Sequence, residues 1–104
     1  MENLRYELAP TRPAGGARSA ALVGVVASGN LEVLLERCEA PDQCVIDVAT
    51  PAHGFAELWA AVASDFAARS PAGGLRITIN DGGARPDTVA LRLAQGVRLM
   101  ERPE

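Results

Sequence analysis

The sequence contains no lysine, and its charge composition limits the partners that it can bind. All ten basic residues are arginines, and against 13 carboxylates they leave a formal net charge of −3. Nucleic-acid binding needs a concentrated positive patch, which a net negative chain does not favour. Aromatic residues make up only 4% of the chain, too few for a surface on which bases stack. We therefore expect no nucleic-acid partner.

Long apolar runs and metal-binding motifs are also missing. No run approaches the roughly 20 residues that span a bilayer, and the polar stretch 1–13 does not resemble a signal peptide. We therefore expect no membrane partner and a cytoplasmic location, where thiols stay reduced. Cys38 and Cys44 flank a predicted loop and would approach each other if that loop were a hairpin. We interpret them as ordinary thiols, because His53 lies at a spacing that completes no zinc site, and we predict no metal.

The length and composition predict one folded domain. The chain has 104 residues, of which 48% are hydrophobic and 22% charged, as is typical of a soluble globular protein. We assign residues 1–104 to a single domain. Within it, the Pro- and Gly-rich stretch 10–18 predicts a flexible loop.

The segment 20–37 predicts two strands joined by a tight turn. Residues 20–28 are almost all apolar, which predicts a strand buried on both faces. Gly29 and Asn30 tolerate positive φ and favour a two-residue hairpin. Residues 31–37 alternate, with Leu, Val and Leu on one face and two glutamates on the other.

The rest of the chain predicts further strands and two helices. Strands are expected over residues 4–8, 44–49 and 75–80, with turns at 40–42 and 81–83. Helices are expected over 55–69, with an apolar stripe of Phe55, Leu58, Trp59, Val62 and Phe66, and over 86–101, which begins with a proline. The fold class is therefore α+β: a two-layer sandwich of a mostly antiparallel sheet, about five strands, with two helices on one face. The strand–helix–strand step around residues 55–69 predicts one parallel pair.

Catalytic chemistry is hard to find in this chain. His53 is the only histidine, and no serine lies in a nucleophile elbow beside it. Glu32 and Glu36 are four residues apart on a strand, roughly 13 Å, too far for a coupled acid and base. The Asp81-Gly82-Gly83 turn before a helix is only a weak anion-binding signal. We assign no catalytic residue, while a small enzyme that uses His53 and a nearby carboxylate stays an alternative.

Two segments carry a resemblance to a known family. They are residues 24–36, GVVASGNLEVLLE, and residues 77–95, ITINDGGARPDTVALRLAQ. Together they resemble the acyl carrier (delta) subunit of biotin-independent malonate decarboxylase. That family has a strand ending in a small-Ser-Gly turn before Leu-Glu-Val-Leu, and an Ile-x-Asp-x-Gly-Ala-x-Pro stretch leading into a helix with Leu-Arg-Leu. The likeness covers about residues 20–95.

The resemblance implies a covalent attachment site at Ser28. In that family a 2′-(5″-phosphoribosyl)-3′-dephospho-CoA group is joined to this serine through a phosphodiester, and Gly29 and Asn30 would form the turn that presents it. The chain departs from the family pattern at Ala27 and Asn30, which keep the turn chemistry. It also departs at Gly82 and at Arg85, a residue we consider as a contact for a phosphate of the group.

The resemblance also implies the function. The chain would be a non-catalytic carrier that holds acetyl and malonyl thioesters during decarboxylation of malonate to acetate and CO2. Its partners would be the acyltransferase and decarboxylase subunits and the transferase that attaches the prosthetic group. Two further alternatives stay open: a regulatory or binding α+β module without a covalent group, and a carrier of the citrate lyase type.

Overall fold

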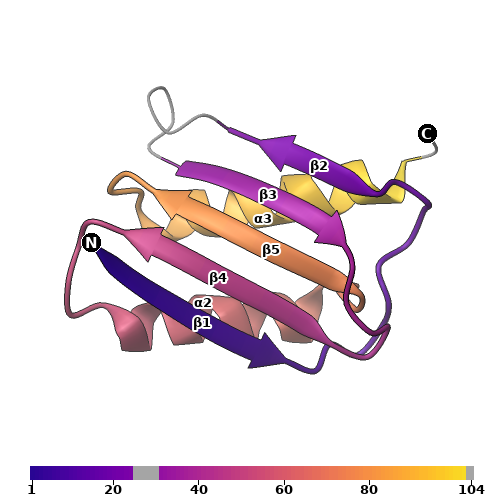
Figure 1. Cartoon of the computed structure of the whole chain (residues 1–104), viewed down its shortest axis with the longest axis horizontal. Coiled ribbons are helices and arrows are strands. Elements are labelled where there is room, and N and C mark those ends of the chain that lie inside the picture. The colour runs from indigo at the N-terminus through magenta and orange to yellow at the C-terminus, as the bar shows by residue number, and fades with distance from the viewer. Residues whose placement is uncertain (25–30, 103–104) are drawn as a thin grey trace.

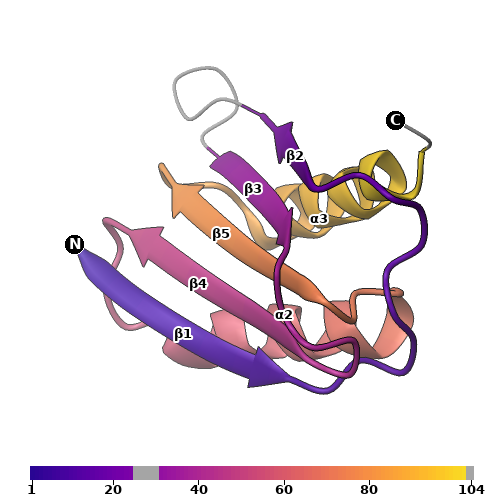
Figure 2. The same cartoon turned by 45° about the vertical axis from the view of Figure 1, so that its right-hand side comes forward.

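The computed structural model describes residues 1–24 and 31–102, and these form two layers (Figure 1). One layer is a five-stranded sheet within the described residues, and the other consists of two helices that cover the same face of the sheet (Figure 2). The predicted α+β sandwich is therefore confirmed, with a mostly antiparallel sheet. The elements are β1 (Glu2–Leu8), β2 (Ala20–Val23), β3 (Leu31–Arg37), β4 (Cys44–Thr50), α2 (Ala56–Arg69), β5 (Leu75–Asp81) and α3 (Pro86–Glu101).

The strand order in the sheet is β1-β4-β5-β3-β2. The pair β4–β5 is parallel, and α2 makes the crossover between its strands, as predicted. The other three pairs are antiparallel. Because β5 lies between β3 and β4, the loop around residues 40–42 is a turn but does not close a hairpin. Its turn is made by the Gln43 amide, which donates to the Ala40 carbonyl at 2.9 Å.

The core lies between the sheet and the two helices. Alternate residues of β3 and β5 face the helices and are almost completely buried, as their alternation predicts. From α3, the predicted inner face of Val89, Leu93, Val97 and Met100 packs onto them. Gly96 permits the closest approach, because a Cβ at that position would overlap the side chain of Leu35. The buried strand residues are Leu31, Val33, Leu35, Leu75, Ile77 and Ile79.

The apolar stripe of α2 is only partly buried. Trp59 and Phe66 lie in the core, but Phe55 is 49% exposed and Leu58 is 44% exposed. The apolar stripe of the predicted helix is therefore not part of the core at its N-terminal end. The helix itself begins at Ala56 with Phe55 as its N-cap residue, so Phe55 lies where the chain enters the helix, outside the layer that packs on the sheet.

The strand β2 differs from its prediction in two ways. It ends at Val23, because Gly24 has a φ of 77° and leaves the extended conformation, and residues 25–28 of the predicted strand lie outside the described residues. Its burial alternates, with Ala21 and Val23 buried and Leu22 58% exposed. The prediction of burial on both faces is wrong because β2 lies at the edge of the sheet and the helices cover one face only.

The stretch 10–18 has no helix or strand, and its backbone is tied to β3 by one side chain. Arg37 donates from Nε to the Arg18 carbonyl at 2.9 Å and from Nη1 to the Ala14 carbonyl at 3.0 Å. Its Nη2 donates to the Gly15 carbonyl at 2.9 Å and to the Met100 carbonyl, in the last turn of α3, at 3.2 Å. The arginine thus joins the loop, the sheet and the helix, and the predicted flexibility of the loop stays a prediction.

The two thiols are far from equivalent. Cys38 is exposed and Cys44 is buried, and both are free. Burial, with a smaller contribution from the charge of Glu39, raises the pKa of Cys44 to about 12. A buried neutral thiol behaves as a small apolar side chain, which agrees with the interpretation of Cys44 as an ordinary thiol. For Cys38 that interpretation stays a prediction. No helix among the described residues is long and apolar enough to cross a membrane.

Replacing Arg37 by lysine keeps the charge but removes the planar fork, so most of the four hydrogen bonds to backbone carbonyls are lost. We expect the free energy of unfolding to fall by about 2–4 kcal/mol, measured by urea denaturation. The matched control is Arg98→Lys on the exposed side of α3, with a change below about 0.5 kcal/mol. Equal unfolding midpoints for the two variants would contradict the role of Arg37.

Thiol labelling at pH 8 should modify Cys38 in the folded protein and leave Cys44 unlabelled. With a pKa of about 12, only about one Cys44 thiol in ten thousand is ionised at that pH, and the thiolate is the reactive form. Mass spectrometry of the labelled protein should show one adduct when folded and two in urea. Equal rates at the two cysteines in the folded protein would show that Cys44 is not sealed in the core.

Candidate functional site

The residues predicted to carry the function, Ser28, Gly29 and Asn30, lie outside the residues that the structure describes. The structure does place both ends of the segment 25–30. It leaves β2 after Gly24 and enters β3 at Leu31, and these strands form an antiparallel pair whose last described partners are Val23 and Val33. The segment is therefore the connection at one end of the sheet, next to its edge.

The two ends of this segment meet closely at Gly24 and Leu31. Gly24 has a φ of 77°, a conformation that side chains disfavour. A Cβ at Gly24 would also overlap the carbonyl oxygen of Leu31. Glycine is thus required here for two independent reasons. We call the pair Gly24 and Leu31 the neck of the segment, since it holds both ends together against β3.

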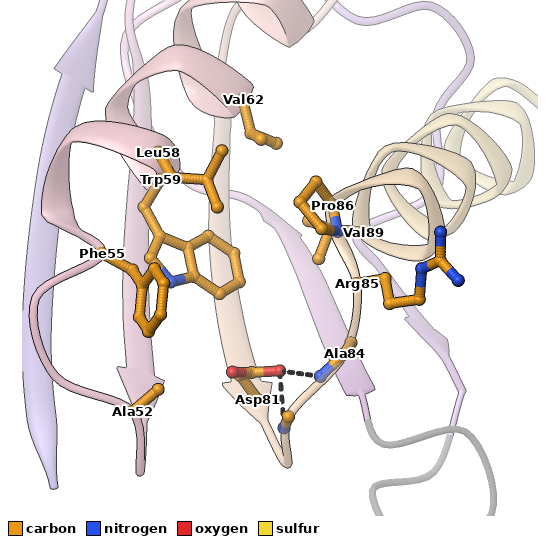
Figure 3. Close-up of a pocket in the computed structure, with 11 residues that line it drawn as sticks. Ala52, Phe55, Leu58, Trp59, Val62, Asp81, Ala84, Arg85, Pro86 and Val89 are labelled. Atoms are coloured by element: carbon orange, nitrogen blue, oxygen red, sulfur yellow. Dashed lines mark hydrogen bonds between the residues drawn. The ribbon is translucent and has the colours of Figure 1, made fainter.

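The neck lies beside the carboxyl end of β5, because Leu31 is the register partner of Asp81. Asp81 is buried, and both of its carboxylate oxygens accept hydrogen bonds. Oδ1 accepts from the amides of Gly83, at 3.0 Å, and Ala84, at 2.7 Å (Figure 3). Oδ2 accepts from the Thr50 hydroxyl at 2.7 Å. The carboxylate therefore fixes the turn between β5 and α3 and joins it to the end of β4.

The hydrogen bonds of Asp81 explain how the turn in the second motif, residues 77–95, leads into α3. Arg85, the N-cap residue of α3, makes no side-chain hydrogen bond to the helix, because arginine is a poor capping residue. Asp81 instead satisfies backbone amides of the turn before the helix, and Pro86 at the start of α3 has no amide hydrogen that needs a partner. Sequence reasoning found the turn but missed the bond from Thr50, which lies 31 residues earlier in the chain.

An apolar pocket of about 300 Å³ opens at this end of the molecule, between α2 and α3 (Figure 3). Its walls include the exposed side chains Phe55 and Leu58 and the ring of Trp59. The titratable residues of its lining are Asp81, whose carboxylate is already hydrogen-bonded, and Arg85. The pocket can therefore accept an apolar group, but its described lining offers no free base or nucleophile.

Arg85 extends into solvent. Its side chain is 84% exposed and its Nε lies 3.6 Å from a carboxylate oxygen of Asp87. Such an exposed ion pair contributes little to stability. The predicted contact between Arg85 and a phosphate stays a prediction, and the arginine has a partner on its own helix.

A different arginine, Arg92, lies at the neck, and the sequence reasoning did not assign it a role. Its Nη1 donates to Gln95 Oε1 at 3.0 Å, while its Nε is buried without a hydrogen-bond partner. The Nε lies 3.6 Å from the position that a Cβ would occupy at Gly24. The available sequence signal was an arginine between two leucines in the predicted helix, which does not by itself show where the guanidinium points.

The other candidate residues do not form a catalytic site. His53 is exposed, and no hydrogen bond or ion pair joins it to another described residue. Glu32 lies opposite Asn80, whose amide donates to it at 3.3 Å on the open face of the sheet. No group of three or more potential metal ligands occurs within residues 1–24 and 31–102.

Comparisons with known proteins agree with one another. The family model of the malonate decarboxylase delta subunit (MdcD) matches residues 18–100. The malonate decarboxylase acyl carrier protein of Bradyrhizobium diazoefficiens is 57% identical over 98 residues, covering 94% of this chain and 93% of that protein. The protein of the same name from Xanthomonas axonopodis pv. citri is 50% identical over 101 residues, covering 97% and 96%.

A solved structure is similar over nearly the whole chain. It is a chain in the crystal structure of a Pseudomonas malonate decarboxylase hetero-tetramer in complex with malonate. The TM-score is 0.80 and the sequence identity 39%, and the match covers 96% of this chain and 99% of that chain. The likeness therefore extends over almost the whole fold.

Replacing Thr50 by valine should remove the hydroxyl donor and leave Asp81 Oδ2 buried with an unmet acceptor. We expect the free energy of unfolding to fall by about 1–3 kcal/mol, measured by urea denaturation. Thr78→Val on the open face of the sheet is the control and should change it by less than about 0.5 kcal/mol. If Thr50→Val were no more destabilising than Thr78→Val, the buried hydrogen bond would contribute nothing measurable to the free energy of unfolding.

Proposed function

Because the chain belongs to the malonate decarboxylase delta subunit family, we propose that it is the acyl carrier subunit of a malonate decarboxylase and that its acyl group is carried on Ser28. The family match and the relatives named as acyl carrier proteins support the carrier role. The assignment of Ser28 depends on the motif of residues 24–36. The single observation that carries it is that the part of this motif containing Ser28, the segment 25–30, connects β2 to β3 and has its two ends held together at the neck.

The described residues are compatible with the group that this function requires. The proposed group is 2′-(5″-phosphoribosyl)-3′-dephospho-CoA, which is anionic at each of its phosphates. At the neck the charged side chain is a cation, Arg92, whose buried Nε has no hydrogen-bond partner. The neighbouring carboxylate, Asp81, has its hydrogen-bonding capacity taken by Thr50 and two backbone amides. A positive charge without a carboxylate partner among the described residues therefore lies beside Gly24, which supports an anionic group in the segment that follows.

The rigid part of the chain supports the attached group. When bound, the group supplies a thiol at the end of a long arm, to which acetyl and malonyl groups are joined as thioesters. The protein fixes where that arm begins, since the neck, β3 and α3 hold the attachment segment at one end of the sheet. Tethering raises the effective concentration of the acyl group at each partner site.

The catalytic residues should lie on partner subunits. The described residues bring together no nucleophile and base, and the apolar pocket has no free titratable group. We therefore propose that the acyltransferase and decarboxylase subunits perform the two chemical steps, exchange of acetyl for malonyl and loss of CO2. A separate transferase would attach the group. A cytoplasmic location stays a prediction.

The proposal is tested by replacing serines in a reconstituted malonate decarboxylase. Ser28→Ala should reduce CO2 release from malonate to background, because the attachment oxygen is gone. Ser64→Ala, at an exposed position of α2, is the matched control and should keep activity within about twofold. All variants should unfold at the same urea concentration. Full activity with Ser28→Ala would overturn the proposal and favour a module without a covalent group.

The same assay separates the other two alternatives. His53→Ala should keep CO2 release within about twofold, since the exposed imidazole has no partner within the described residues. A large loss with unchanged folding would favour an enzyme that uses His53. Supplying citrate in place of malonate should give no turnover, whereas turnover of citrate alone would point to a carrier of the citrate lyase type.

A further inference from the structure

One edge of the Arg92 guanidinium has no partner among the described residues. The Nη1 nitrogen is held by Gln95 Oε1 at 3.0 Å, which fixes the orientation of the group. The opposite edge, formed by Nε and Nη2, makes no hydrogen bond within the described chain, and Nε is buried. A buried charged donor without an acceptor is costly, and such a group calls for an explanation.

Other arginines in this protein show what a satisfied guanidinium looks like. Arg5, Arg69 and Arg85 each lie within 4.0 Å of a carboxylate oxygen. The Nε of Arg76 is also buried without a hydrogen-bond partner, but it lies 3.5 Å from a carboxylate oxygen of Asp47 and 3.9 Å from one of Glu39, which balance its charge. The partly buried Arg37 uses Nε, Nη1 and Nη2 on backbone carbonyls. Within residues 1–24 and 31–102, Arg92 has neither arrangement. Its free edge is therefore available to an acceptor that residues 1–24 and 31–102 do not supply.

The position of Arg92 indicates what that acceptor is. Its Nε lies 3.6 Å from the Cβ position at Gly24, which precedes the segment that contains Ser28. Ser28 is four residues from Gly24 and three from Leu31, so the chain can extend it no more than about 13 Å from the first and about 10 Å from the second. A group on the Ser28 oxygen thus starts within reach of this side chain.

We propose that Arg92 binds a phosphate of the group attached to Ser28, through the edge formed by Nε and Nη2. This inference rests on the proposed function. A phosphodiester keeps its negative charge at neutral pH, and the arginine fork matches two phosphate oxygens through parallel hydrogen bonds. Because Arg92 projects from the middle of α3, a rigid element, it would hold the start of the arm close to the neck and leave the thiol end free to move.

The first test compares the wild-type protein with and without its group. The Nε–H resonance of Arg92 is assigned in the unloaded protein as the signal that disappears in Arg92→Gln. On loading, this resonance should shift and its hydrogen should exchange more slowly with water. Unchanged position and exchange rate, in protein that mass spectrometry shows to be loaded, would overturn the proposal for Arg92 and leave the carrier function intact.

The second test compares the melting temperature of loaded and unloaded protein. Loading should raise the melting temperature of the wild type by about 4 °C or more, because the intramolecular phosphate contact stabilises the folded state. Arg92→Gln should abolish this rise, and Arg92→Lys should restore part of it. Arg98→Gln, on the same helix and exposed, is the control and should keep the rise in full. The same rise in Arg92→Gln as in the wild type would contradict the proposal.

The experiments distinguish failure of the function proposed for Ser28 from failure of the contact proposed for Arg92. A wild-type protein that carries no group, although made together with the other components of the complex, would overturn the function proposed for Ser28. If the wild type is loaded but its phosphate gives the same ³¹P resonance as in loaded Arg92→Gln, only the contact with Arg92 is overturned. The proposal predicts that the ³¹P resonance of the phosphodiester differs between the loaded wild type and loaded Arg92→Gln.

Discussion

The closure of the chain between Gly24 and Leu31 is the constraint on which the site depends. A positive φ at Gly24 turns the chain out of β2, and the missing side chain lets it pass against the Leu31 carbonyl. Since Leu31 is fully buried and paired with Asp81, the neck is joined to the best-packed part of the sheet. Any larger residue at position 24 would separate the two ends of the segment 25–30.

The rest of the fold makes this end of the sheet rigid. The Asp81 carboxylate ties the turn before α3 to Thr50 at the end of β4, and α3 packs through Gly96 against β3. At the opposite end of β3, Arg37 joins the 10–18 loop to the last turn of α3. The chain thus has a stable handle without a catalytic centre among its described residues. That arrangement suits a protein whose chemistry is performed on a tethered group by other subunits.

Much of the fold could be predicted from local pattern. The strand over residues 31–37 and the helix over 86–101 have the predicted bounds, because strict alternation and a proline at the helix start are local signals. The predictions that were wrong concerned residues whose burial depends on elements distant in the sequence. The apolar run after Ala20 suggested burial on both faces, but β2 is an edge strand. Phe55 continues the helical spacing of α2 and still faces a pocket.

The site was predictable only in part. The motif around Ser28 indicated the attachment residue through resemblance to a family, and the structure describes the residues on either side of it. Arg92 could not be found in the sequence, because its distinguishing property is an unpaired nitrogen at Gly24, 68 positions earlier in the chain. The bond between Thr50 and Asp81 was hidden for the same reason. Long-range polar pairs leave no periodic signal in a sequence.

The central claim is that a single hydroxyl, that of Ser28, anchors the working group. Its most direct test is peptide mapping by tandem mass spectrometry of this subunit, purified within the assembled complex from cells that make it naturally. The account predicts one phosphorus-containing adduct, confined to the peptide that spans residues 19–37 and localised to Ser28. An unmodified Ser28 in an active complex, or an adduct on a different residue, would contradict it.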